Sequence, residues 1–208
     1  MRRTKEDAEQ TRLSILASAM DIFYEKGYSK TTFDEIAKRI NLTKGAVYWY
    51  FRNKPDIVAA LINDFTDRYI NLLHIFWEQN PTPSFERIIK MQLFINKKIR
   101  EDILFYKFLF FITCQMEWSE AIINKIQPSI EQTKQVTRRL FLDALEALQQ
   151  QKQIRDDVDI AMICEILMTL YGGLLEAEFT HRLTNDFDSA VTTGFNLIFN
   201  SIKTEGIK

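Results

Sequence analysis

Helix-breaking residues are rare in this chain, and their scarcity restricts its fold more than any other feature. Only six of the 208 residues are glycine and four are proline. Between these breakers apolar residues recur at three- and four-residue steps, as in residues 8–26, where Leu16 and Phe23 share one helical face before Gly27 ends the helix. Strand-like alternation occurs only in very short stretches. The sequence therefore predicts an all-α protein.

Later breaks in the periodicity predict where the other long helices begin and end. The sequence Asn80-Pro81-Thr82-Pro83 ends a helix that begins near Lys54. Pro128 predicts a further break, because proline in a helix interior removes a backbone hydrogen bond. The helices expected in this part of the chain span 54–79, 84–100, 103–117, 129–152, 158–181 and 186–203.

Two short helices with strong start signals follow the first helix. Thr32 and Glu35 form a predicted capping box, in which the threonine hydroxyl accepts from the N3 amide and the glutamate reaches back. Asn41-Leu42 form a tight turn, and Thr43 caps the next helix, which ends near Tyr50. This is the minimum of a helix-turn-helix, whose second helix enters the major groove of DNA.

Charge is distributed unevenly between the two parts of the chain. Residues 1–55 carry eleven Lys/Arg and seven Asp/Glu, whereas residues 56–208 carry sixteen and twenty-one. A basic head on an acidic body is expected when only the head meets a polyanion. We predict a three-helix DNA-binding domain at residues 1–55 and a helical bundle at residues 56–208.

Residues 43–50 have the properties of a DNA-recognition helix. The helix N-terminus presents amides and a positive dipole end to phosphate. Gly45 and Ala46 allow the backbone to come close to bases, while Val47 and Phe51 take the buried positions. The aromatic side chains between them are then left for the surface, where they can contact phosphates or thymine methyl groups. On spacing alone, a packed corner without DNA binding remains the alternative.

Residues 15–61 resemble the DNA-binding domain of the tetracycline-repressor (TetR) family. A Tyr-Trp pair in the recognition helix is frequent in the AcrR-like branch, which represses multidrug-efflux genes. Tyr50 departs from the family pattern, which usually has histidine there. The resemblance rests on the order and spacing of FYEKGY (23–28), TTFDEIA (31–37), TKGAVYWYF (43–51) and NK (53–54).

The resemblance implies a role for each matching residue of the head. Lys44, Gly45 and Ala46 would approach the bases. Arg2, Arg3 and Lys5 form either a basic arm on DNA or a solvated tip, and both options stay open. The residues implied to hold the DNA backbone are Thr32, Thr43, Lys44, Tyr48, Trp49, Tyr50 and Lys54.

Residues 56–208 contain most of the aromatic side chains, and most of these are expected simply to pack a core. The segment from Phe105 to Trp118 is an exception, because it is apolar nearly all round yet contains polar residues. Apolar walls with a few polar groups are typical of a small-molecule site, and the resemblance implies an inducer site here. The predicted ligand-binding residues are Phe65, Trp77, Met91, Lys107, Phe108, Phe111, Glu117, Met168, Tyr171 and Glu178.

The partners follow from these features. A carboxylate such as Glu117 or Glu178 would suit a lipophilic, cationic ligand. Because one head makes few base contacts, we predict a homodimer on a palindromic double-stranded DNA operator. The last two helices are candidates for its seam, although packing within one chain is the alternative for them. The residues predicted for dimerisation are Gly172, Gly173, Phe195 and Phe199.

Other classes of protein receive little support from the sequence. His74 and His181 are the only histidines, and metal-ligand spacings, nucleophile elbows and phosphate loops are missing, so we predict no enzyme, no metal and no cofactor. Cys114 and Cys164, expected to be reduced and buried, leave a redox-sensing regulator as one alternative, and a global regulator without an inducer is another. Without a signal peptide or an apolar run of about 18 residues, a cytoplasmic protein with no membrane partner is expected.

Overall fold

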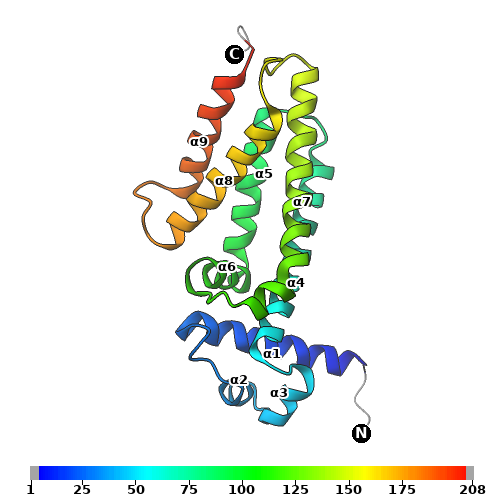
Figure 1. Ribbon diagram of the computed structural model, residues 1–208, viewed down its shortest axis with the longest axis vertical. Helices are drawn as coiled ribbons and strands as arrows, with labels where there is room; N and C mark the ends of the chain where they lie inside the picture. The colour runs from blue at the N-terminus through cyan, green and yellow to red at the C-terminus, as the bar shows by residue number, and fades with distance from the viewer. Residues whose placement is uncertain (1–4, 205–208) are drawn as a thin grey trace. The chain divides into compact units, whose positions relative to one another are not determined.

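The computed structural model describes residues 5–204 and confirms the all-α prediction (Figure 1). Within this range the ordered elements are α-helices and one π-helical segment, with a single isolated bridge between Ile154 and Lys203. The elements are α1 (Lys5–Lys26), α2 (Phe33–Arg39), α3 (Lys44–Tyr50), α4 (Lys54–Gln79), α5 (Phe85–Glu101), α6 (Ile103–Phe110), the π-helical segment η1 (Phe111–Gln115), α7 (Glu120–Gln150), α8 (Ile160–Phe179) and α9 (Phe187–Ile202).

Two of the predicted helix boundaries are wrong. Helix α7 runs through Pro128, where a break was predicted. The turns before the proline are anchored by Ile122 and Ile126, which are buried, so the missing hydrogen bond at Pro128 does not end the helix. The helix predicted at 103–117 ends as an α-helix at Phe110 and continues as η1 only to Gln115.

The chain folds into two compact units. Unit 1 comprises Met1–Asp67 and Asp102–Ile130, and unit 2 comprises Arg68–Glu101 and Glu131–Lys208. Helices α4 and α7 each begin in unit 1 and end in unit 2. Packing therefore groups α6, η1 and the start of α7 with α1–α3, whereas the functional boundary at residue 55 stays a prediction.

Aromatic side chains join α6 and η1 to the other helices of unit 1. The rings of Phe111 and Phe23 stack with centroids 5.0 Å apart, and both side chains are fully buried. Phe65 of α4 stacks on Phe108 at 4.2 Å. At the edge of this core, Lys107 Nζ lies 2.6 Å from Asp21 Oδ1. The N-terminal helices thus share one core with residues 102–115.

Two backbone positions with positive φ shape the helix-turn-helix. Gly27, with φ 82°, follows α1, and its amide donates to the carbonyl of Phe23 at 2.8 Å. Asn41, with φ 54°, occupies the turn after α2, a conformation that asparagine tolerates better than most residues. The next amide, of Leu42, donates to the carbonyl of Ala37 at 2.9 Å. This turn confirms the predicted link between the two short helices.

Unit 2 is built on helices α5, α8 and α9. Phe195 and Phe199 of α9 are fully buried within the chain, and the Phe199 ring lies 4.9 Å from that of Phe85. Cys164 of α8 is also buried, as predicted. In unit 1, however, Cys114 is exposed. It lies near the end of η1, and Phe111 is the residue of η1 that is buried. The prediction that both cysteines are buried is therefore wrong for Cys114.

Candidate DNA interface and ligand site

Helix α2 begins with the predicted capping box. The amide of Glu35 donates to Thr32 Oγ1 at 3.4 Å, and the amide of Thr32 donates to Glu35 Oε2 at 3.0 Å. Lys26 of α1 also donates to the Glu35 carboxylate. The hydrogen bonds from Lys26 and then Thr32 lower the pKa of Glu35 to about 2. This network fixes the start of α2 against the end of α1.

Helix α3 is held by one cap and one buried face. Thr43 Oγ1 accepts a hydrogen bond from the amide of Ala46 at 3.2 Å. Val47 is fully buried and Phe51 nearly so, which confirms the pair predicted to face the core. Gly45 is exposed, and a Cβ built on it would meet only Thr43 Oγ1, at 3.9 Å. The N-terminal turn of α3 therefore offers an open, nearly bare backbone to a partner.

Two aromatic side chains of α3 are left on the surface. Trp49 is 74% exposed and Tyr48 is 49% exposed, although Tyr48 also packs on Phe33 with centroids 4.7 Å apart. Lys44 is exposed beside them, and its Nζ lies 3.2 Å from Asp34 Oδ2. An exposed indole is unusual enough to need an explanation, and a DNA surface supplies one.

Two residues at the end of this region, both predicted to hold the DNA backbone, make contacts within the chain or are turned inward. The Tyr50 hydroxyl is buried without a hydrogen-bond partner, so in this conformation it does not face a phosphate. Lys54 Nζ donates to the carbonyls of Tyr28 at 2.8 Å and Ser29 at 3.1 Å. Burial lowers the pKa of Lys54, and its ammonium also lies over the Tyr28 ring. Lys54 thus ties the start of α4 to the loop before α2.

The proposed basic arm is described only in part. Arg2 and Arg3 lie outside the described residues. Lys5 is the first residue of α1 and is exposed. Thr32 and Thr43 are exposed as well, with their hydroxyls engaged in the caps described above. The phosphate contacts predicted for these two threonines stay predictions.

Five of the predicted ligand-binding residues lie in unit 1. Phe65, Phe108 and Phe111 form its aromatic core. Lys107 is turned to Asp21, and Glu117 is exposed and accepts a hydrogen bond from Ser29. Lys107 is thus engaged in an ion pair and Glu117 is exposed in the segment after η1, so neither lies inside an apolar pocket as expected.

The other five predicted residues lie in unit 2. The Trp77 ring is covered by the Arg87 guanidinium, 3.7 Å from its centroid. Met91 is fully buried, and Glu178 is half-buried. The Tyr171 hydroxyl donates to Asn96 Oδ1 at 2.5 Å, and burial is the main cause that raises its pKa. Met168 lines a cavity, described next.

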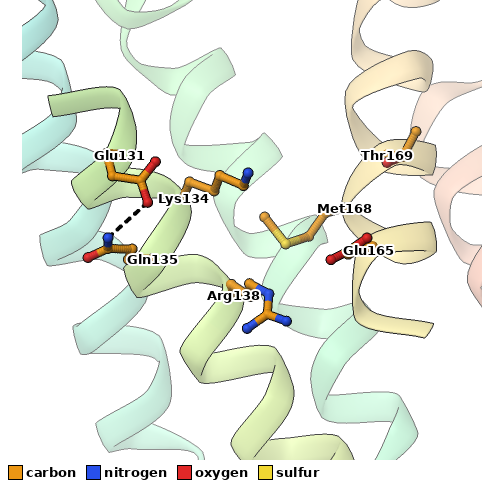
Figure 2. Close-up of a pocket in the computed structure, with 7 residues that line it drawn as sticks. All are labelled: Glu131, Lys134, Gln135, Arg138, Glu165, Met168 and Thr169. Atoms are coloured by element: carbon orange, nitrogen blue, oxygen red, sulfur yellow. Dashed lines mark hydrogen bonds between the residues drawn. The ribbon is translucent and has the colours of Figure 1, made fainter. Parts of the chain in front are cut away.

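A cavity of about 630 Å³ lies between α7 and α8, and Figure 2 shows the side chains that line it. Of the predicted ligand residues, Met168 is among those lining it. The Met168 side chain points into the space between the two helices (Figure 2). The lining residues are Glu131, Lys134, Gln135, Arg138, Glu165, Met168 and Thr169.

Two buried amides in α5 were missed by the sequence analysis. Gln92 is 1% exposed and Asn96 is 3% exposed. They lie four residues apart on the face of the helix that also buries Met91, Ile95 and Ile99. Two amides within an otherwise apolar helical face were the signal that could have revealed them, since buried polar side chains need a partner.

The residues predicted for dimerisation divide into two groups. Phe195 and Phe199 are buried within one chain, so the prediction that they face a second chain is wrong. Gly172 and Gly173 are exposed on α8.

Helix α8 is long and apolar enough to cross a membrane, with a mean hydropathy of 1.6, but only 17% of its apolar stretch is buried within the chain. Such an apolar, uncovered helix needs a partner surface.

Two short capped helices, of which the second is exposed, have the geometry of a helix-turn-helix. Residues 15–61 match the sequence model of a family described as bacterial regulatory proteins, tetR family. This part of the chain is therefore similar to the DNA-binding domain of that family.

Relatives match the chain over different lengths. The HTH-type transcriptional regulator TtgR of Pseudomonas putida is 40% identical over 72 residues, which cover 35% of this chain and 34% of TtgR. The HTH-type transcriptional repressor BepR of Brucella suis is 29% identical over 189 residues, or 87% of this chain and 86% of BepR. The match thus spans about a third of TtgR but most of BepR.

A solved structure shares the fold of most of the chain. SmeT, described as the repressor of the Stenotrophomonas maltophilia multidrug efflux pump SmeDEF, superposes with a TM-score of 0.75 at 19% identity and covers 96% of this chain and 94% of SmeT. The structure of the SmeT–triclosan complex superposes with a TM-score of 0.76 at 20% identity. The match covers 95% of this chain and 93% of SmeT in that complex.

Proposed function

We propose that this protein is a ligand-responsive transcriptional repressor that binds a palindromic operator as a dimer and controls a multidrug efflux system. The proposal is carried by α3, which exposes Lys44 at its capped, uncovered N-terminus and Trp49 in its last turn. BepR is named a repressor and SmeT the repressor of an efflux pump, which supports the sign of regulation and the target. The role is regulatory rather than enzymatic and belongs in the cytoplasm, where operator DNA lies.

Operator contacts should be dominated by phosphate. The ion pair between Lys44 and Asp34 is exposed, so a DNA phosphate can replace the carboxylate at little cost. Gly45 and Ala46 bring the backbone close to the bases but offer few groups to read them. Much of the specificity must then come from the spacing of two recognition helices, which a dimer sets.

Helix α8 supplies the surface proposed for dimerisation. Met162 is 54% exposed and Ile166 is 42% exposed, and they lie four residues apart on one face of the helix. Gly172 and Gly173, also exposed, would allow the backbone of a partner helix to approach closely. A second copy of the chain would remove these apolar groups from water, which stabilises the dimer by roughly 25 cal/mol per Å² of apolar area.

Helix α4 is the proposed link between ligand and operator. It begins at Lys54, whose contacts with Tyr28 and Ser29 hold the loop before α2, and it extends into unit 2. A ligand that favours one position of this helix over another changes the spacing of the two heads. The SmeT complex with triclosan supports a small lipophilic ligand.

A redox-sensing mechanism receives less support. Burial raises the pKa of the Cys164 thiol, with a smaller opposing effect from Arg138. A thiol with a raised pKa contains little thiolate near neutral pH and reacts slowly. We therefore favour a bound ligand over thiol oxidation as the signal.

Operator binding with a matched pair of lysine variants tests the proposal. Lys44→Ala should weaken operator binding at least about tenfold, because it removes a phosphate contact. The same loss should make operator affinity less dependent on salt concentration. Lys90→Ala is the control, since Lys90 is also exposed and also pairs with a carboxylate, that of Glu86. Fluorescence anisotropy with labelled operator measures both affinities. Equal affinities for the two variants would exclude α3 as the recognition helix.

A further inference from the structure

Helix α8 places two sulfur atoms in contact inside unit 2. Cys164 Sγ lies 3.9 Å from Met168 Sδ, four residues further along the helix. Cys164 Sγ also lies 3.8 Å from the backbone carbonyl oxygen of Arg138 on α7. A thiol is a weak donor and a thioether is a weak acceptor, so the contact between the two sulfurs contributes little to stability. Two soft donor atoms are therefore held together without a strong bond between them.

The distance between the two sulfurs suits a metal ion bound to both. Residues four apart share one face of a helix, so Cys164 and Met168 can ligate the same ion without any movement of the backbone. A metal–sulfur bond is about 2.3 Å long, and two such bonds from sulfurs 3.9 Å apart enclose an angle of about 115° at the ion. The ion would therefore lie beside the line that joins the two sulfurs, with room for both bonds.

The cavity between α7 and α8 provides a path to the two sulfurs. Met168 and Arg138 both line it, so the two groups that contact the thiol belong to residues of the cavity wall. The Met168 side chain extends into the space between the helices, and it is flexible enough to let an ion pass (Figure 2). Two cations and two carboxylates line the cavity, so their charges balance and a small cation can enter.

The donor atoms and the burial of the site select the class of ion. Thiolate and thioether ligands favour soft ions such as Cu(I). A monovalent ion would replace the thiol proton of Cys164, which passes to solvent, and the site would stay neutral. A divalent ion would leave a net positive charge beside a side chain that is fully buried, which is costly. Among residues 5–204, no group of three or more His, Cys, Asp or Glu side chains could hold a metal ion instead.

We propose that Cys164 and Met168 form a binding site for a soft monovalent metal ion, Cu(I) or its analogue Ag(I). The thiolate of Cys164 supplies the negative charge, and the thioether of Met168 supplies the second bond. This site replaces the expectation from the sequence that the chain binds no metal. It depends neither on operator DNA nor on a lipophilic ligand, so the proposed function and the metal site can each fail without the other.

Calorimetric titration of the full-length protein with silver nitrate, in buffer without chloride, tests the role of the thioether. Every protein carries Cys114→Ser, because the exposed Cys114 thiol would bind Ag(I) by itself. One Ag(I) should bind per chain in this background. Met168→Leu should weaken binding at least about tenfold, because leucine keeps the volume and removes the sulfur. Met162→Leu is the matched control, since Met162 is on the same helix but 54% exposed, and it should leave the affinity unchanged.

The thiol is tested in the same Cys114→Ser background. Cys164→Ser should abolish the binding of Ag(I), because a hydroxyl is neither soft nor ionised near neutral pH. Melting temperatures show whether each variant is folded, and Cys164→Ala makes the same test if the serine variant is not. Equal Ag(I) affinity in Met168→Leu and in the background protein would show that a thiol alone binds the ion. That result would overturn the proposal, as would a background protein that binds no Ag(I).

The ion class and the ligands are tested directly by two further measurements on the Cys114→Ser protein. Zn(II) should bind at least about 100-fold more weakly than Ag(I), because two sulfur ligands and one negative charge do not satisfy it. X-ray absorption of the protein loaded with Cu(I) under anaerobic conditions should show two sulfurs at about 2.3 Å, and one in Met168→Leu. Tighter binding of Zn(II), or a single sulfur ligand in the Cys114→Ser protein, would refute the site.

Discussion

Helices α3 and α5 place their polar and apolar groups in opposite ways. Helix α3 leaves the Trp49 indole 74% exposed and also exposes Lys44, whereas α5 buries the amides of Gln92 and Asn96. The exposed indole and the unpartnered Gln92 oxygen each cost free energy in the isolated chain, since both lack their preferred surroundings. The difference teaches that α3 presents its polar and aromatic groups to a partner outside the chain, whereas α5 keeps its amides within the packing of unit 2.

The largest expected effect is on stability, and it tests whether unit 1, which contains α3, and unit 2, which contains α5, each depend on a closely packed aromatic core. Phe111→Ala removes a fully buried ring that stacks on Phe23 in unit 1, and we expect a loss of about 3–5 kcal/mol in the free energy of unfolding. Phe195→Ala should cost unit 2 a similar amount, because Phe195 is equally buried. Urea unfolding followed by circular dichroism measures both. A loss below about 1 kcal/mol for Phe111→Ala would contradict its central position.

The next effect distinguishes the exposed aromatic residue of α3 from its partly buried neighbour. Trp49→Ala should weaken operator binding about 10- to 100-fold while leaving stability within about 0.5 kcal/mol of the wild type. Tyr50→Phe should leave operator affinity unchanged, because the Tyr50 hydroxyl is buried without a partner. Anisotropy titrations and thermal melts measure the two quantities. A large loss of affinity in Tyr50→Phe would show that the hydroxyl turns outward on DNA.

A smaller effect is expected at the capping box of α2. Thr32→Ala removes the hydroxyl that accepts from the Glu35 amide and should lower stability by about 1 kcal/mol. Thr32→Ser keeps a hydroxyl in the same place and serves as the control. Chemical denaturation of the three proteins at one salt concentration measures the difference. Equal stability of the alanine and serine variants would show that the cap contributes nothing.

The smallest effect is a pH dependence at Glu35. Its pKa falls from 4.5 to about 2 in the folded protein, mainly through the hydrogen bond from Lys26. A lowered pKa in the folded state stabilises the protein above the unfolded value, and this contribution is lost as pH falls toward about 2. Glu35→Gln should therefore lose less stability than the wild type between about pH 5 and pH 2. Because the pair is partly exposed, high salt should reduce the difference. Identical pH profiles in denaturant titrations would contradict the shift.

Local signals in the sequence predicted the helix-turn-helix in detail. The capping box at Thr32, the cap at Thr43 and the turn at Asn41 all act within one or two helical turns, so neighbouring residues suffice to specify them. Val47 and Phe51 were correctly assigned to the core for the same reason, since helical periodicity alone separates them from Tyr48 and Trp49.

The ligand region was predicted less well, because its geometry depends on residues far apart in the chain. Lys107 and Asp21 are 86 positions apart, and only their packing shows that the lysine leaves the predicted pocket. Gln92 and Asn96 share the apolar face of α5, but periodicity does not show which helices cover that face or whether a buried amide finds a partner there.

By itself the sequence determined the all-α fold, the caps and the two short helices of the helix-turn-helix, since these follow from hydrogen bonds and periodicity along a single helix. Only the tertiary structure decided that Phe195 is buried within the chain while Met162 and Ile166 remain exposed, and that Pro128 lies inside α7. The physical reason is that periodicity shows which residues share a helical face, whereas burial depends on which other helices cover that face.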